Sequence, residues 1–439
     1  MESHATDLPA TRPLMGPLAA RLRQDIALQR AACALAGMLA IVVVVGTGAY
    51  LALGTVPHGG FDPPGVVDHL GGLRDALAAP FARWDSVWYL TIARHGYTTG
   101  PTAAFFPLYP LLVAGVSSLG PGLLLSGVLV SLAAMLVALR LVWRLTEIEL
   151  GPGGRDVADL AVFAVALGPM AFFFTAVYTE SVYLALTLGA FVAARQDRWA
   201  RAGLLGALAA ATRSSGLILM VPLVLLWLDQ RRPASRWARR PAGFDRPRPA
   251  SGRRRDLLWI GIVPLGLVAY LVWLAATGLD PLAPFSSQQD WFRHFTGPIG
   301  GIREGARAAF DGARQLLSGQ RRTVYYPLAG GDPIVAGWHN VMLFGFLLGA
   351  VPLLIGAVRR LPLAYGVYAL AGTCLALSYP VSPEPLTSLP RYLVVLFPLP
   401  IALAIWIARH PRLRVPVLGA SAVSLAGFTE LFATWHWIA

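Results

Sequence analysis

The chain has 439 residues, of which 56% are hydrophobic and only 13% are charged. Soluble proteins carry about 25% charged residues, so the composition excludes an ordinary soluble enzyme and indicates a membrane protein. The net charge of +13 comes from arginine alone, and arginines that flank apolar runs indicate membrane topology rather than nucleic-acid binding. Cys33 and Cys374 both fall inside apolar runs, so no disulfide or zinc framework is predicted.

Residues 1–30 contain four arginines and are too long and too polar to be the basic end of a cleaved signal peptide. The apolar run that follows has no convincing small-residue cleavage site, so we expect it to be a retained first span. The sequence therefore predicts a cytoplasmic segment over 1–30 and a single transmembrane domain over 31–439.

Apolar runs of sufficient length predict about eleven transmembrane helices. One apolar region, 199–228, is longer than a span needs and is interrupted by "ATRSSG", so we divide it near Arg213 into two short helices. The other predicted spans are 31–53, 122–143, 157–177, 181–194, 257–277, 338–358, 361–379, 391–408 and 415–435.

The apolar stretch 105–119, "FFPLYPLLVAGVSSL", is short and broken by two prolines. If it does not span, every short arginine-rich connection falls on one side, as expected for cytoplasmic loops. We therefore place 105–119 along the outer leaflet, the amino terminus inside and the carboxyl terminus outside. This topology makes 54–121 and 278–337 external loops and 229–256 a cytoplasmic linker with ten arginines and three aspartates.

In the second external loop, apolar residues recur every three or four positions, which predicts an amphipathic helix. It could lie on the outer leaflet as a lid over a lipid-facing groove, or be a merely structural surface helix. The residues of this stripe are Ile302, Ala306, Ala309, Phe310, Ala313 and Leu317.

The stretch "FARWDSVWYLTIARHGY" at 81–97 places Asp85 between Trp84 and Trp88 in the first external loop. Tryptophans at this position are typical of the aromatic belt of a membrane protein. A carboxylate at membrane depth is costly and tends to be functional, so Asp85 is the main candidate for a general base. Arg83 and His95 lie close to it in sequence.

Three further charges fall on the external face. Glu180 lies between two apolar runs beside Tyr178, where it could be catalytic or could join Thr179 in capping a helix. Arg213 and Arg391 oppose the positive-inside bias, which favours phosphate binding by their guanidinium groups, although either could instead snorkel to lipid headgroups.

The eight histidines show no metal-binding spacing, and no phosphate-binding glycine motif is present. No metal, nucleotide or other cofactor is therefore predicted.

Five blocks of the sequence resemble the PIG-V family of mannosyltransferases, which act on glycosylphosphatidylinositol (GPI) precursors. The first block, at 81–97, is the most specific of them. The family belongs to the GT-C superfamily of polytopic glycosyltransferases that use lipid-phosphate sugars. The other blocks are "AFFPLYPLLV", "FTAVYTESVYLAL", "AATRSSGLIL" and "LPRYLVVLFP", so the resemblance covers about residues 81–400.

The resemblance implies a GT-C-like fold with external juxtamembrane helices in the first loop. It also implies that Asp85 is the catalytic acid and that Glu180, Arg213 and Arg391 line the site. The complete set of candidate substrate-binding residues is Arg83, Trp84, His95, Tyr178, Glu180, Arg213, Arg391 and Tyr392.

The predicted function is transfer of mannose from a polyprenyl-phosphate-mannose donor to a lipid or glycolipid acceptor at the outer face of the plasma membrane. The donor sugar is implied by the resemblance alone, and the acceptor stays open. The alternatives are a lipid-linked sugar flippase, a non-catalytic envelope scaffold, or the same fold acting on another sugar. The predicted partners are therefore the lipid-linked donor, a lipid or glycan acceptor and membrane lipids, without nucleic acid.

Overall fold

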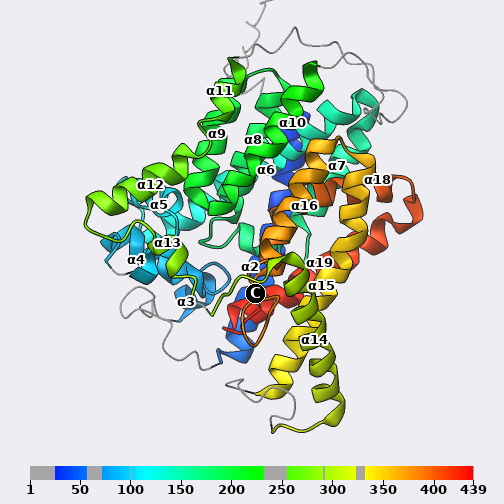
Figure 1. Ribbon diagram of the computed structural model, residues 1–439. Coiled ribbons are helices and arrows are strands. Elements are labelled where there is room, and N and C mark those ends of the chain that lie inside the picture. The colour runs from blue at the N-terminus through cyan, green and yellow to red at the C-terminus, as the bar shows by residue number, and fades with distance from the viewer. Residues whose placement is uncertain are drawn as a thin grey trace, which may run out of the picture.

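The computed structural model describes residues 25–56, 72–98, 100–231, 255–289, 292–322 and 332–438 (Figure 1). These residues form helices and no β-sheet, apart from an isolated β-bridge between Arg293 and Val381. The predicted all-helical membrane fold is confirmed. Residues 1–24 of the amino-terminal segment and most of the predicted linker lie outside the described ranges.

Within the described ranges, five segments are long and apolar enough to cross a membrane, which confirms a multi-pass membrane protein. Each of the eleven predicted spans contains a helix, although several of these helices are short, so the number of crossings stays a prediction. The five segments are α2 (Ile26–Leu53), α6 (Leu123–Leu150), Ser214–Arg231 with α10 (Met220–Arg231), α15 (Pro333–Arg360) and Pro411–Ala433 with α19 (Arg414–Ala433). The shorter helices of the predicted spans are α7 (Arg155–Ala166), α8 (Glu180–Arg195), α9 (Trp199–Thr212), α11 (Asp256–Ile260), α12 (Leu265–Ala276), α16 (Leu363–Leu377), α17 (Leu389–Val394) and α18 (Pro398–Ala408).

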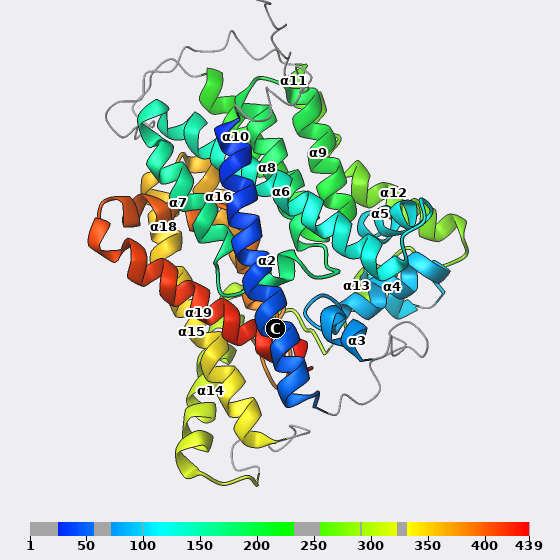
Figure 2. The same ribbon diagram turned by 180° about the vertical axis from the view of Figure 1, so that it is seen from behind.

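The first loop folds into three short helices beside the bundle: α3 (Leu73–Ala78), α4 (Asp85–His95) and α5 (Leu108–Ser117). At 1.5 Å per residue, the ten residues of α5 reach about 15 Å, half of the roughly 30 Å hydrocarbon core. This length agrees with the prediction that 105–119 does not cross the membrane alone. Helices α4 and α5 gather with α12 and α13 (Ala283–Ser286) on one flank of the molecule (Figures 1 and 2).

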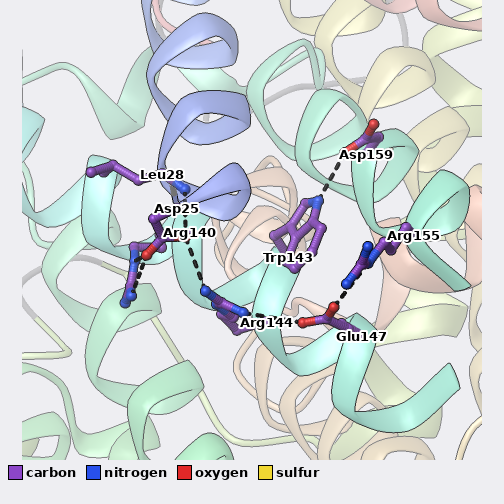
Figure 3. A network of polar contacts seen from close by, with 8 residues as sticks. All are labelled: Asp25, Leu28, Arg140, Trp143, Arg144, Glu147, Arg155 and Asp159. Carbon is purple, nitrogen blue, oxygen red and sulfur yellow. Dashed lines mark hydrogen bonds and ion pairs between the residues drawn. The ribbon is translucent and has the colours of Figure 1, made fainter. Parts of the chain in front are cut away.

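The arginine-rich connections meet at one end of the bundle. Asp25 caps α2 by accepting a hydrogen bond from the Leu28 N–H, and it pairs with Arg140 and Arg144 of α6 (Figure 3). Burial disfavours the charged form of Asp25, but the hydrogen bonds from Arg140 and Leu28 and the charges of both arginines outweigh it and lower its pKa. In the same network, Glu147 receives hydrogen bonds from Arg144 and Arg155.

A buried ion pair joins α8 to α6 at this same end. The Arg195 Nε donates to Glu149 Oε1 at 2.7 Å, and the two side chains are 3% and 7% exposed. Arg195 also binds Asp229 of α10, and the hydroxyl of Tyr365 on α16 donates to Glu149. Glu149 therefore joins α6, α8 and α16, and Arg195 adds α10 through Asp229.

Helix α14 (Gly297–Ser318) confirms the helix expected in the second external loop. Small residues pack against α15 and α16, and a Cβ added at Gly301 would lie 1.8 Å from the Leu377 carbonyl oxygen. Of the predicted apolar stripe, Ala309 is buried, whereas Ile302, Phe310 and Leu317 are exposed, so the expected contact of these large side chains with the outer leaflet stays a prediction. Because glycine and alanine permit the closest helix contact, they occupy the packed face and leave the large side chains outside.

The buried ion pair between Glu149 and Arg195 leads to a prediction about stability. Glu149→Gln leaves the buried Arg195 with a single exposed carboxylate partner, and breaking a buried ion pair costs about 3–5 kcal/mol. We expect thermal unfolding of the detergent-purified protein to shift several degrees downward. The matched control is Arg155→Gln, whose side chain is 57% exposed and whose loss costs about 1 kcal/mol or less. Equal melting temperatures for the two variants would contradict this assignment.

Candidate functional site

Charged side chains from four separate parts of the chain meet at the end of the bundle opposite the arginine-rich connections. They are Asp85 at the start of α4, Glu180 at the start of α8, Arg213 just after α9, and Arg391 in α17. The structure therefore brings together the four charges that the sequence predicted for one site, although up to 306 residues separate hydrogen-bonded partners.

Glu180 is the centre of this cluster and is fully buried. Its Oε1 accepts hydrogen bonds from Arg213 Nη2 at 2.9 Å and from Arg391 Nε at 3.0 Å. The capping alternative is not observed, because the Thr179 side chain makes no cap hydrogen bond to α8. Since an isolated carboxylate could not stay ionised here, the two guanidinium groups are what stabilise Glu180 in the core.

Arg391 connects Glu180 to Asp85. Its Nη1 donates to Asp85 Oδ2 at 2.7 Å, while its Nε binds Glu180. The guanidinium also lies 4.7 Å from the centre of the Tyr178 ring, a cation–π distance. Arg391 is therefore held on three sides, and its side chain is only 8% exposed.

Arg213 has fewer hydrogen-bond partners than Arg391. Its Nη2 binds Glu180, and its Nη1 is buried with no hydrogen-bond partner among the described residues. The Tyr392 ring lies 5.4 Å from the guanidinium, which places this predicted site residue in the cluster as well. A buried charged donor without a partner is costly, so Arg213 is suited to receive an anionic group.

Tyr178 fixes the backbone that carries Asp85. Its hydroxyl accepts a hydrogen bond from the Asp85 N–H at 3.2 Å and donates to the Arg83 carbonyl oxygen at 3.0 Å. Helix α4 has no side-chain cap from its own N-cap residue, so this tyrosine satisfies one of its free N–H groups. The Asp85 side chain is 21% exposed, which makes it the most accessible of the four charges.

Arg83 and Trp84 directly precede Asp85 and pack against the last residues of the chain that the structure describes. Arg83 is buried and donates to the carbonyl oxygens of Ala82 and Ala433, while the Trp84 ring makes edge contacts with Trp435 and Trp437. Trp84 has φ 56°, a left-handed conformation that costs a residue of this kind about 1–3 kcal/mol. Strain of this kind collects at functional sites, and here it directly precedes Asp85.

The structure does not bring His95 to the cluster. His95 is exposed at the far end of α4, ten residues from Asp85, which corresponds to about 15 Å along a helix axis. Its closeness in sequence to Asp85 is thus not closeness in space, because one helix separates them.

Sequence reasoning missed two neighbours of the site. Arg293 donates to the hydroxyl of Ser388, the N-cap residue just before the helix of Arg391, and Trp435 packs against Arg83 and Trp84. Arg293 lies in a loop with little hydrophobic periodicity. Trp435 is about 350 residues away in sequence from Arg83 and Trp84. Neither position carries a sequence signal that would have revealed it.

Part of this site lies in a region that matches a known family model. Residues 49–228 match the model of the family Mannosyltransferase (PIG-V), a range that holds Asp85, Glu180 and Arg213 but not Arg391. The GPI alpha-1,6-mannosyltransferase 2 of Rattus norvegicus is 34% identical over 167 residues, or 36% of this chain and 33% of the relative. The human protein of that name is 32% identical over 167 residues, with the same coverage. The Drosophila melanogaster GPI mannosyltransferase 2 is 28% identical over 165 residues, 34% of each chain.

The matched region spans about a third of the length of these relatives. Among solved structures, the oligosaccharyltransferase of Archaeoglobus fulgidus is similar with a TM-score of 0.38 and 12% identity, over 91% of this chain and 55% of that one. The resemblance predicted from the sequence blocks is confirmed: residues 49–228 of this chain match the model of the PIG-V mannosyltransferase family.

Proposed function

We propose that the chain is a membrane glycosyltransferase that moves mannose from a polyprenyl-phosphate-mannose donor to a hydroxyl of a lipid or glycolipid acceptor. The observation that carries this proposal is the cluster itself. It holds one accessible carboxylate, Asp85, and one arginine, Arg213, whose buried Nη1 has no hydrogen-bond partner among the described residues, and Glu180 and Arg391 connect the two. The family match at residues 49–228 supports mannose as the sugar.

The reaction follows as a single displacement. Asp85 takes the proton of the acceptor hydroxyl while the hydroxyl oxygen forms a bond to the anomeric carbon of mannose. The bond between that carbon and the phosphate oxygen breaks, and its electron pair leaves with the polyprenyl phosphate. Attack from the face opposite the phosphate converts a β-linked donor into an α-linked product.

The two arginines take different roles in this proposal. Arg213 would bind the departing phosphate through its free Nη1, because negative charge develops there in the transition state. Arg391 acts as a positioning residue, since its donors already hold Asp85 and Glu180. Glu180 is pinned by both arginines and has no exposed surface, so it orients the cations rather than reacting.

We also propose that the cluster faces the outside of the plasma membrane. Cytoplasmic loops carry an excess of arginine, and the connections around Asp25, Arg155 and Arg195 lie at the end opposite Asp85. The site would then meet lipid-linked sugars in the outer leaflet.

The first prediction tests the base. Asp85→Asn keeps the size and can still accept a hydrogen bond from Arg391, but it cannot take a proton. General-base catalysis contributes about 10²–10⁴-fold, so transfer of radiolabelled mannose should fall by that factor while donor binding persists. Asp85→Glu, with its carboxylate shifted by about 1 Å, should fall between the parent and Asn.

The matched control is Asp280→Asn, an exposed aspartate that accepts only a local backbone hydrogen bond. It should keep parental turnover. Near-parental transfer by a well-folded Asp85→Asn protein would remove Asp85 from the mechanism. A loss of melting temperature in step with the loss of activity would make its role structural.

The second prediction separates the arginines. Lysine keeps the charge but loses the planar fork, and a hydrogen bond to a charged group is worth about 10- to 100-fold in binding. Arg213→Lys should weaken binding of polyprenyl phosphate by that factor, measured by native mass spectrometry. Arg391→Lys should leave this binding near parental and lower kcat. Arg303→Lys, an exposed arginine of α14, is the control, and parental behaviour of both site variants would exclude the assigned roles.

The third prediction concerns orientation. In a background with both cysteines replaced, Ser318→Cys at the end of α14 should react with an impermeant maleimide in intact cells. Gln196→Cys, in the exposed turn between α8 and α9, should react only after permeabilisation. Labelling of both positions from one side would refute the topology.

A further inference from the structure

The short helix that carries Arg391 starts from a strained residue. Ser388, the N-cap residue of α17, has φ 68°, a left-handed conformation that is unfavourable for any residue with a side chain. Its carbonyl oxygen accepts a hydrogen bond from the Tyr392 N–H at 3.1 Å, which closes the first turn of the helix. Arg391 lies within that turn, so the backbone conformation of Ser388 sets where the Arg391 side chain begins.

The Ser388 hydroxyl is not used as a helix cap. An N-cap serine normally accepts a hydrogen bond from the N–H of the second or third helical residue. In α17 the second residue is Pro390, which has no N–H, and the Ser388 side chain makes no cap hydrogen bond. The hydroxyl instead accepts a hydrogen bond from Arg293 Nη2 at 3.2 Å, across 95 residues of sequence. Ser388 itself is only 6% exposed.

The backbone at Arg293 is held against the same part of the chain. Arg293 forms the isolated β-bridge with Val381, and the His294 N–H donates to the carbonyl oxygen of Pro380 at 3.2 Å. Both partners belong to the connection that leads from α16 to α17. The segment before α14 therefore grips this connection twice, through its backbone near the start and through the Arg293 side chain at Ser388.

We propose that Arg293 is a positioning residue for the transfer reaction: it holds Ser388 in its left-handed conformation and thereby fixes Arg391 against Asp85. This inference rests on the proposed function, in which Arg391 acts through the base that it holds. The contacts run from Arg293 to the Ser388 hydroxyl at 3.2 Å and, one helical turn later, from Arg391 Nη1 to Asp85 Oδ2 at 2.7 Å. The loss of Arg293 should therefore slow the reaction without weakening the binding of the donor.

Removing either side of the contact should have the same effect. Arg293→Met deletes the donor and Ser388→Ala deletes the acceptor. A hydrogen bond to a charged group is worth about tenfold or more, so each variant should lower kcat about tenfold. The KM for undecaprenyl-phosphate-mannose should stay within about twofold of the parent. The double variant should match the single variants, whereas independent effects would multiply to about 100-fold.

Two conservative variants separate positioning from a general loss of structure. Arg293→Lys keeps a charged donor, and it should restore most of the turnover because Arg293 makes this single side-chain hydrogen bond among the described residues. Ser388→Gly adopts a positive φ without strain, so it should lose less kcat than Ser388→Ala. Adding Arg293→Met to the Gly variant should then change kcat no further. The matched control is Arg303→Met, an exposed arginine of α14, which should keep parental kcat.

A second readout does not need mannose transfer. Hydrogen–deuterium exchange followed by mass spectrometry reports local opening of the backbone. In Arg293→Met, exchange should become faster in peptides that cover 389–396. In Arg303→Met, exchange of the same peptides should stay parental.

The outcomes separate this inference from the proposed function. If the parent transfers no mannose but exchange over 389–396 rises in Arg293→Met, the proposed reaction fails and the hold of Arg293 on α17 stands. If exchange over 389–396 does not rise, that hold is refuted with or without transfer.

If the parent transfers mannose, three kinetic results would overturn the positioning role. One is parental kcat in Arg293→Met. Another is a rise in the donor KM alone, which would mean that Arg293 contacts the donor directly. The third is a loss of turnover that Arg293→Lys does not restore or that multiplies in the double variant.

Discussion

The arrangement of the site depends on one buried carboxylate. Glu180 has no exposed surface, and burying an unpaired carboxylate costs on the order of several kcal/mol in lost hydration. Its pairing with Arg213 and Arg391 through one oxygen fixes the angle between the two guanidinium groups. Because Arg391 also binds Asp85, the position of the proposed base is set by a residue that never needs to meet the substrate.

The same network explains how distant parts of the chain act together. Its members come from α4, α8, the end of α9 and α17, so the first-loop helices are held to the bundle by charge as well as by packing. The opposite end has its own buried carboxylate, Glu149, which holds Arg195 and Tyr365. Two carboxylates therefore organise the two ends, and the cluster around Glu180 combines an accessible acid, Asp85, with an arginine atom, Arg213 Nη1, that has no hydrogen-bond partner among the described residues.

The sequence allowed much of this to be predicted. Hydropathy located the helical segments, and Arg213 and Arg391 were selected as site candidates because, in the predicted topology, they oppose the positive-inside bias. It could not show that Arg391 is occupied by Asp85 and Glu180 while Arg213 keeps a free donor, since hydrogen-bond partners depend on tertiary geometry. The short spacing between Asp85 and His95 was misleading for the same reason. The sequence also did not show which face of α14 packs against the bundle, because close helix contact favours small residues over large apolar ones.

The central claim is single displacement with Asp85 as the only accessible carboxylate of the cluster. The most direct measurement is the anomeric configuration of the product that the purified protein makes from β-linked polyprenyl-phosphate-mannose. The account predicts an α-linked mannose, released by α-mannosidase and identified by NMR. A β-linked product would require a second carboxylate as nucleophile, and Glu180 is too deeply buried to take that role. A β-linked product would therefore contradict the account, and so would the absence of any transfer.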